Sequence, residues 1–287
     1  MKYCIGDTVV CINVEEQNLH SNFQAFRCDE SEEPQLTIDI VEEPEMTMNI
    51  QMTVGQNMLM ESEEIGVFEG AMGIDLLYPK NVQLTSIAIA KGYRSAKVYV
   101  VQDAEGKWKE ELFLALRDVI YLALEQNGRF VLDSSSLFVD GRGVILAADP
   151  NAEFAGICQG KQIGKILNDS ANIIGIYKER LYLYGTPWCS PEAVQAERAP
   201  LGGIVFLKKS DAGAVTDLPE DKRQLLMLVH CKSPFWREGL LDQCLNTIQR
   251  VEPSVWIRQL ESHADEAAAD VLKPALDTIE NDTVAEY

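Results

Sequence analysis

Apolar and polar residues alternate along several stretches of the first hundred residues. The alternation runs over 36–40, 46–54, 88–90 and 97–102. A period of two is typical of a strand with one buried face. The pattern therefore predicts a β-rich N-terminal region.

Helical and strand patterns follow each other along the rest of the chain. Apolar residues recur at helical spacing between Leu112 and Ala123, and Asn127-Gly128 provides a stop signal. After this helix we expect strands at 130–139, 144–148, 163–167, 172–177, 180–184, 203–207 and 254–260, and helices at 153–160, 220–230, 237–250 and 264–275. Turn signals at Gly141-Arg142 and Lys178-Glu179 indicate hairpins. Strands mixed with helices in this way predict an α/β domain.

Charge divides the chain unevenly. The 287 residues carry 45 acidic and 25 basic side chains, a net charge of −20, and residues 1–70 hold 15 of the acids against only Lys2 and Arg27. Such a shift in composition indicates a separate unit. We predict an acidic β-rich domain over 1–104 and an α/β domain over 105–287.

The same acidity excludes several classes of partner. Nucleic acids and anionic membranes both require a basic surface, which this sequence lacks. The most apolar stretch, 112–124, is too short to span a bilayer, and the N-terminus has no apolar signal segment. Seven cysteines without C-x-x-C spacing are typical of thiols in a reducing cytosol, and three scattered histidines predict no structural zinc. We expect a cytoplasmic protein.

Two features of the acidic region allow more than one interpretation. The runs at 29–33, 42–45 and 61–64 are either solvated turns or a docking surface. Methionines at 46, 48, 52, 58 and 60 either pack in the core, the more frequent arrangement, or form an adaptable binding face.

A series of motifs in the second region resembles a known family. In order, these are Leu132-Asp133-Ser134-Ser135-Ser136, a DG turn, Leu167-Asn168-Asp169, Gly185-Thr186-Pro187-Trp188 and a buried strand beginning Pro200-Leu201-Gly202-Gly203. The series is similar to the C-terminal domain of bacterial HPr serine kinase/phosphorylase, which is related to phosphoenolpyruvate carboxykinase. The resemblance implies a P-loop kinase-like mixed sheet with flanking helices, here preceded by a smaller β-rich domain.

This chain departs from the family at every position that the resemblance assigns to ATP. The family has a histidine where Asp133 stands, and a loop G-x-x-G-x-G-K-[ST] that here reads Ala148-Asp149-Pro150-Asn151-Ala152-Glu153-Phe154-Ala155. Such a loop needs glycines to close around phosphates, a lysine for their charge and a hydroxyl for magnesium. Phe154 stands in place of the lysine, Ala155 replaces the hydroxyl, and Glu153 adds negative charge.

The acidic pair of the family is also incomplete. Asp169 remains, but Ser170 stands in the second place. Asp169 is either a turn or capping residue, the more frequent role, or a cation ligand, and Asp133 could bond the neighbouring serine hydroxyls. Cys158 has no nearby His or Lys to lower its pKa, so packing is favoured over nucleophilic catalysis; Cys189, in a loop, is the thiol most expected to be exposed, but no base is paired with it. We therefore predict no catalytic residue, cofactor or metal.

Three functions remain open. The favoured hypothesis is a non-catalytic kinase-like protein that binds a protein or peptide, with a basic partner suiting the acidic domain. The alternative is a phosphotransferase or nucleotide-binding enzyme with a rebuilt site, in which Asp133, Asp149 and Asp169 hold magnesium. A structural role, shown by a stable homo-oligomer, is the third. Phe154 and Ile157 predict that the former nucleotide cleft is filled.

Overall fold

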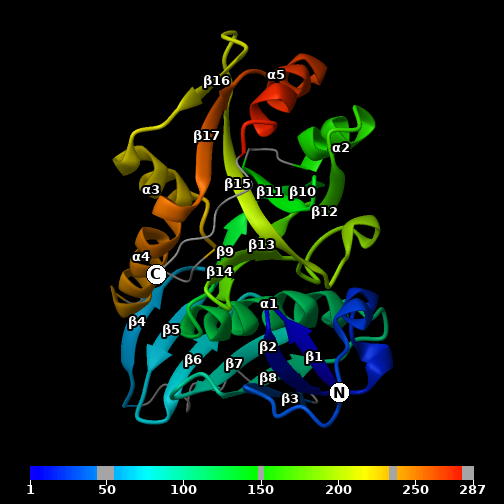
Figure 1. The fold of residues 1–287 in the computed structure, drawn as a ribbon. Coiled ribbons are helices and arrows are strands. Elements are labelled where there is room, and N and C mark those ends of the chain that lie inside the picture. Colours follow the sequence, from blue (N-terminus) through cyan, green and yellow to red (C-terminus); the bar gives the residue numbers. More distant parts are fainter. Residues whose placement is uncertain (44–54, 148–151, 233–237, 280–287) are drawn as a thin grey trace. The chain divides into compact units, whose positions relative to one another are not determined.

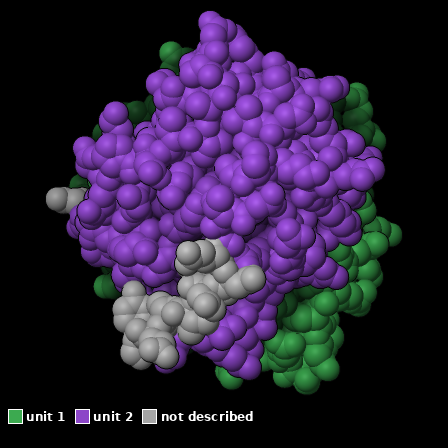
Figure 2. Space-filling view, turned by 45° about the horizontal axis from the view of Figure 1, so that its top comes forward, with its two compact units in different colours: residues 1–127, 234–241 green, residues 128–233, 242–287 purple. Residues whose placement is uncertain are grey.

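The structure is a computed structural model that describes residues 1–43, 55–147, 152–232 and 238–279. The chain divides into two compact units, Met1–Asn127 with Pro234–Leu241 and Gly128–Ser233 with Asp242–Tyr287 (Figure 2). Each unit contains a mixed sheet, and helices accompany both, so the chain has the mixed α/β class that the sequence indicates. In the described ranges, no helix combines the length and the apolar character needed to cross a membrane.

The first unit is built on an eight-stranded sheet with the order β1-β2-β3-β8-β7-β6-β5-β4 (Figure 1). Its strands are β1 (Lys2–Ile5), β2 (Thr8–Asn13), β3 (Leu36–Glu43), β4 (Asn57–Glu61), β5 (Gly66–Glu69), β6 (Gly73–Leu77), β7 (Leu84–Ala90) and β8 (Ser95–Val101). The pairings β2–β3 and β3–β8 are parallel, and the others are antiparallel.

Helix α1 (Trp108–Gln126) covers one face of this sheet, against β7 and β8. Strand β8 has one buried face for this contact. Ala96, Val98 and Val100 are buried, whereas Ser95 and Lys97, at alternate positions, are exposed. The alternation at 36–40, 88–90 and 97–102 is thus confirmed as strand, but that at 46–54 lies outside the described residues. The unit includes α1, so its boundary after Asn127 differs from the one predicted after residue 104.

The second unit contains a nine-stranded sheet with the path β12-β10-β11-β15-β14-β13-β9, and β17 joins β15 to β16. Its strands are β9 (Phe130–Asp133), β10 (Ser135–Val139), β11 (Arg142–Ala147), β12 (Lys165–Asn168), β13 (Ala171–Tyr177), β14 (Arg180–Tyr184), β15 (Arg198–Lys208), β16 (Ala214–Asp217) and β17 (Trp256–Glu261). The pairings of β15 with β11 and β17 are parallel.

Helices cover both faces of the central strands. They are α2 (Ala152–Gly160), α3 (Glu220–Val229), α4 (Glu238–Val251) and α5 (Glu266–Leu276). Ile145 of β11 lies in one core with Met227 of α3, and its neighbour Leu146 lies in the other with Phe154 of α2 and Leu272 of α5. Because successive side chains of a strand point to opposite faces, α3 and α4 cover one face and α2 and α5 the other.

The predicted strand 130–139 is two strands in the structure. The break falls at Ser134, whose backbone N–H donates to the carbonyl of Ser170 at 3.1 Å. Before it, β9 pairs with β13, and after it, β10 pairs with β11 and β12. The apolar pattern runs through the break because both strands are buried, so the pattern alone could not show it.

Both predicted hairpins are present. Lys178 and Glu179 have φ of 48° and 65° between β13 and β14. In the first hairpin the two turn residues are Asp140 and Gly141, with φ of 47° and 84°, one position earlier than predicted. Positive φ at both residues is typical of the tight turns that match the twist of antiparallel strands.

Candidate functional site

The sheet register brings the predicted site positions to one place in the second unit. Asp133 at the end of β9 pairs with Ala171, next to Ser170. Ser135 pairs with Leu146, near the end of β11, and Ser136 pairs with Asn168 of β12. Asp133, Ser170 and the end of β11, which precedes the segment 148–155, therefore lie close together in the sheet.

The segment 148–155, which was compared with a phosphate loop, is only partly described, since Ala148, Asp149 and Asn151 lie outside the described residues. The described remainder opens α2. Glu153 is exposed, whereas Phe154 and Ala155 have no exposed surface. The ring of Phe154 lies in the core with Leu146. The Phe154 side chain therefore packs between α2 and the sheet.

Asp133 forms an ion pair at the same end of β9. Its Oδ2 lies 2.8 Å from the Nζ of Lys232, and about half of its side chain is exposed. The backbone N–H of Asp133 donates to the carbonyl of His230 at 2.7 Å, and Lys232 donates its backbone N–H to Val131 at 2.8 Å. The segment after α3 therefore supplies a cation for this carboxylate.

Asp169 has a structural contact. Its Oδ1 accepts a hydrogen bond of 3.0 Å from the backbone N–H of Ser190, which starts a short 3₁₀ turn at Pro191–Ala193. Ser170 beside it is exposed, and its backbone N–H donates to the side chain of Asn168. Asp169 therefore holds a turn in place.

A buried polar network fills the space between these strands. Its members Ser134, Ser136, Asn168, Asn172 and Thr186 have no exposed surface. The hydroxyl of Ser136 donates to Oδ1 of Asn172 at 2.6 Å, and Nδ2 of Asn172 donates to the carbonyl of Ser134 at 2.7 Å. Asn168 accepts from the backbone of Ala171 at 2.9 Å and donates to the carbonyl of Thr186 at 3.2 Å.

This network explains several motifs that carry the family resemblance. The serine run, Asn168 and Thr186 all form hydrogen bonds inside the sheet, where an unpaired polar group would be costly. Asn172 and Lys232 were not among the residues predicted from the sequence. An isolated polar residue in the apolar strand 171–176 was the only local signal for Asn172.

The cysteine thiols near the site are protonated at neutral pH. Burial raises the pKa of Cys158 to about 12. Burial, and then the negative charge of Asp169, raise the pKa of Cys189 to about 12. A thiol in this state is a poor nucleophile, in agreement with a packing role.

Metal ligands were predicted only for the rebuilt acidic site. Within residues 1–43, 55–147, 152–232 and 238–279, no group of three or more His, Cys, Asp or Glu side chains could hold a metal ion. Asp149, the third member of that predicted site, lies outside these ranges.

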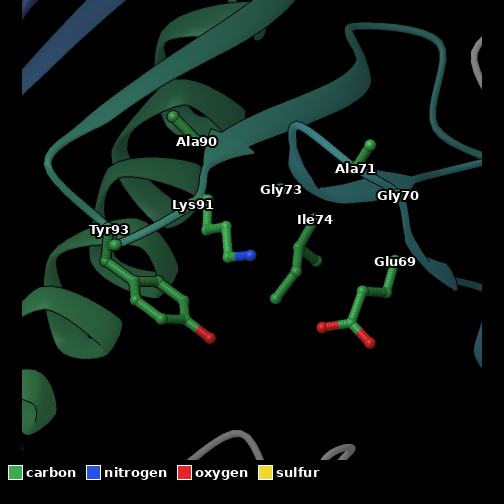
Figure 3. A pocket seen from close by; sticks show the side chains of 9 residues that line it. Glu69, Gly70, Ala71, Gly73, Ile74, Ala90, Lys91 and Tyr93 are labelled. Atoms are coloured by element: carbon green, nitrogen blue, oxygen red, sulfur yellow. The ribbon is translucent and has the colours of Figure 1, made fainter.

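A second candidate site is a pocket of about 370 Å³ in the first unit (Figure 3). It lies between the β5–β6 and β7–β8 turns. Glu69, Lys91 and Tyr93 contribute a carboxylate, an ammonium and a phenol to its lining. A Cβ atom at Gly73, where φ is 152°, would come within 1.9 Å of the carbonyl of Ile89, so this wall requires glycine. The volume suits a small polar group.

Comparisons with known proteins do not identify a family for this chain. No family model matches the chain, and no curated protein matches it. Among solved structures, the HPr(Ser) kinase/phosphatase of Coxiella burnetii is similar at 10% identity and a TM-score of 0.25, over 43% of this chain and 97% of that one. A likeness of this size carries no argument about fold or function.

Proposed function

We propose that this chain is a non-catalytic, kinase-like protein that binds a basic protein or peptide through its acidic first unit. The observation that carries the proposal is the burial of Phe154 in place of the phosphate-binding lysine. Restoring a lysine there would put a charge into the core, which is strongly unfavourable. Exposed Glu153 next to it would repel the phosphates of a nucleotide.

The carboxylates that could replace the lost groups already have partners. Asp133 is paired with Lys232, and Asp169 accepts from the backbone of Ser190. These contacts use one oxygen of each carboxylate and reduce its capacity as a metal ligand or a general base. This favours binding over phosphotransfer.

The first unit has the charge for a basic partner. Its first 127 residues hold 22 acidic and nine basic side chains. Glu61, Glu63 and Glu64 are exposed at the turn between β4 and β5, and Met58 on β4 is 54% exposed. Of the predicted methionine face, 46, 48 and 52 lie outside the described residues. An exposed methionine beside three carboxylates suits a segment with both apolar and basic side chains.

The acidic run Asp29–Glu33 provides a matched comparison. Asp29, Glu32 and Glu33 are also exposed, but they follow the segment that packs on β1, at the opposite edge of the sheet from β4. Lys2 donates from its Nζ to the carbonyls of Glu30 and Glu32. The two triplets, Asp29, Glu32 and Glu33 and Glu61, Glu63 and Glu64, thus contain the same number of exposed carboxylates at opposite edges of the sheet, although Glu63 also pairs with Lys80.

The test measures binding of a fluorescent Lys- and Leu-rich peptide to the full chain by anisotropy. Changing Glu61, Glu63 and Glu64 together to Gln should weaken binding about tenfold, or about 1.4 kcal/mol. The same change at Asp29, Glu32 and Glu33 should weaken it less than about threefold, because rim charges act mainly at long range. Equal losses, or no binding at low salt, would overturn the proposed surface.

Thermal melts with millimolar MgATP test the non-catalytic part separately. A ligand that binds only the folded protein must raise its Tm. We expect no rise. An increase of several degrees would favour the alternative, a nucleotide-binding enzyme.

A further inference from the structure

Two cysteines meet inside the second unit, one of them in the segment whose residues contact Asp133. The Sγ atoms of Cys231 and Cys244 lie 3.1 Å apart. Cys231 follows α3 and is 8% exposed, and Cys244 lies in α4 with no exposed surface. We propose that this pair is a redox site, in which a peroxide converts the two thiols into a disulfide.

The geometry requires little movement. The sulfur atoms of a disulfide are about 2.05 Å apart, so the two atoms must approach by about 1 Å. A rotation of each side chain about its Cα–Cβ bond can change the Sγ position by this amount.

The backbone on both sides of the pair is held in place. Cys231 forms a β-bridge with Leu132 of β9, and the next residue, Lys232, donates to the carbonyl of Val131 at 2.8 Å. Cys244 lies in the same core, which also contains Ile248 one turn further along α4. Once a peroxide has oxidised one cysteine to the sulfenic acid, a second thiol held in contact with it reacts faster than a thiol on a separate molecule.

The chemistry balances with a peroxide as the only oxidant. The thiolate of Cys231, the more exposed of the two, attacks one oxygen of hydrogen peroxide; the O–O bond breaks, and the hydroxide leaves as water after taking a proton. The thiolate of Cys244 then attacks the sulfenic sulfur of Cys231. The S–O bond breaks and releases a second water, so the thiols lose two electrons and the peroxide gains them.

The disulfide would tie α4 to the end of β9. Cys231 lies between His230, whose carbonyl accepts from Asp133, and Lys232, which pairs with the carboxylate of Asp133. Oxidation would therefore fix the segment that supplies the partners of Asp133. The inference rests on this geometry alone and is independent of the proposed peptide binding.

The experiment treats the folded full chain with a small molar excess of hydrogen peroxide. Remaining thiols are alkylated, and the chain is digested with trypsin without reduction. We expect a linked pair of peptides, 224–232 joined to 238–250, with the mass of their sum less two hydrogens. Dithiothreitol should separate them. Failure to find this pair in the folded protein would overturn the proposal.

Cysteine variants test whether the linked peptides arise from this pair of thiols. Cys231→Ala and Cys244→Ala should abolish the linked peptides, whereas Cys158→Ala, at another buried cysteine, should retain them. Oxidised wild type should melt several degrees higher than reduced protein, because the closed loop restricts the unfolded chain. Both Cys231→Ala and Cys244→Ala should lose this rise on peroxide treatment. A linked pair that forms only after denaturation would contradict a preformed site.

Discussion

The hydroxyl of Ser136 donates a hydrogen bond of 2.6 Å to Oδ1 of Asn172, and neither residue has any exposed surface. The two residues are 36 positions apart in the sequence. Their contact joins β10 to β13 at the point where the chain passes from one part of the sheet to the other. The serine run that resembles a catalytic motif in sequence thus serves the sheet itself.

Asn172→Ala should lower the free energy of unfolding by about 1–3 kcal/mol, because it removes the 2.6 Å hydrogen bond of the buried Ser136 hydroxyl and the 2.7 Å hydrogen bond to the Ser134 carbonyl. Urea unfolding followed by circular dichroism measures this loss. Asn246→Ala, at an exposed position of α4, is the control and should change stability by about 0.5 kcal/mol or less. Similar losses in the two variants would contradict the assigned network.

Phe154→Ala should lower stability by about 3–5 kcal/mol, since it removes a fully buried ring from the core beneath α2. The matched control is Phe138→Ala on β10. That ring is 41% exposed, so its loss should cost about 1 kcal/mol or less. If Phe154→Ala were as mild as the control, the ring would not occupy the core.

The ion pair between Asp133 and Lys232 should contribute little to stability. Both side chains are 40% or more exposed, so a double-mutant cycle with alanine should give about 0.2–1 kcal/mol, decreasing at high salt. Arg223 and Glu252 offer a contrast at 2.7 Å, because the Glu252 side chain is only 3% exposed. Glu252→Gln should therefore cost more, about 1.5–3 kcal/mol. A coupling energy between Asp133 and Lys232 that exceeds the loss of stability in Glu252→Gln would contradict the small contribution expected of this exposed pair.

Stability should fall as the pH rises above about 9. Burial raises the pKa of Cys158 to about 12, so between the unfolded and folded pKa values the folded state holds a proton that the unfolded state has lost. The contribution of Cys158 to stability is fully present below the pKa of this thiol in the unfolded state. It is lost as the pH rises toward the pKa of the thiol in the folded state. Cys158→Ala should make the slope of stability between pH 9 and 11 shallower, by up to about 1.4 kcal/mol per pH unit. Urea titrations at each pH measure it. An unchanged slope would show that this thiol ionises equally in both states.

Local sequence signals predicted elements whose partners are close along the chain. The hairpin at Lys178-Glu179 joins adjacent strands, and α1 ends at Asn127-Gly128 as expected. The break at Ser134 was missed, because β9 pairs with the distant strand β13, whereas β10 pairs with its neighbour β11 and with β12. The partner of Asp133 was missed for the same reason: Lys232 follows a helix that no pattern near Asp133 indicates.

The sequence by itself determined the mixed α/β class, the acidic N-terminal region and the absence of glycine, lysine, serine and threonine from residues 148–155. Each of these depends on composition or on short periods, which need no knowledge of distant contacts. Only the tertiary structure decided that Phe154 enters the core, that the serine run bonds Asn172, and that Cys231 meets Cys244. Those contacts arise when strands and helices far apart in the sequence pack together and must satisfy every buried polar group, a condition that the whole fold imposes.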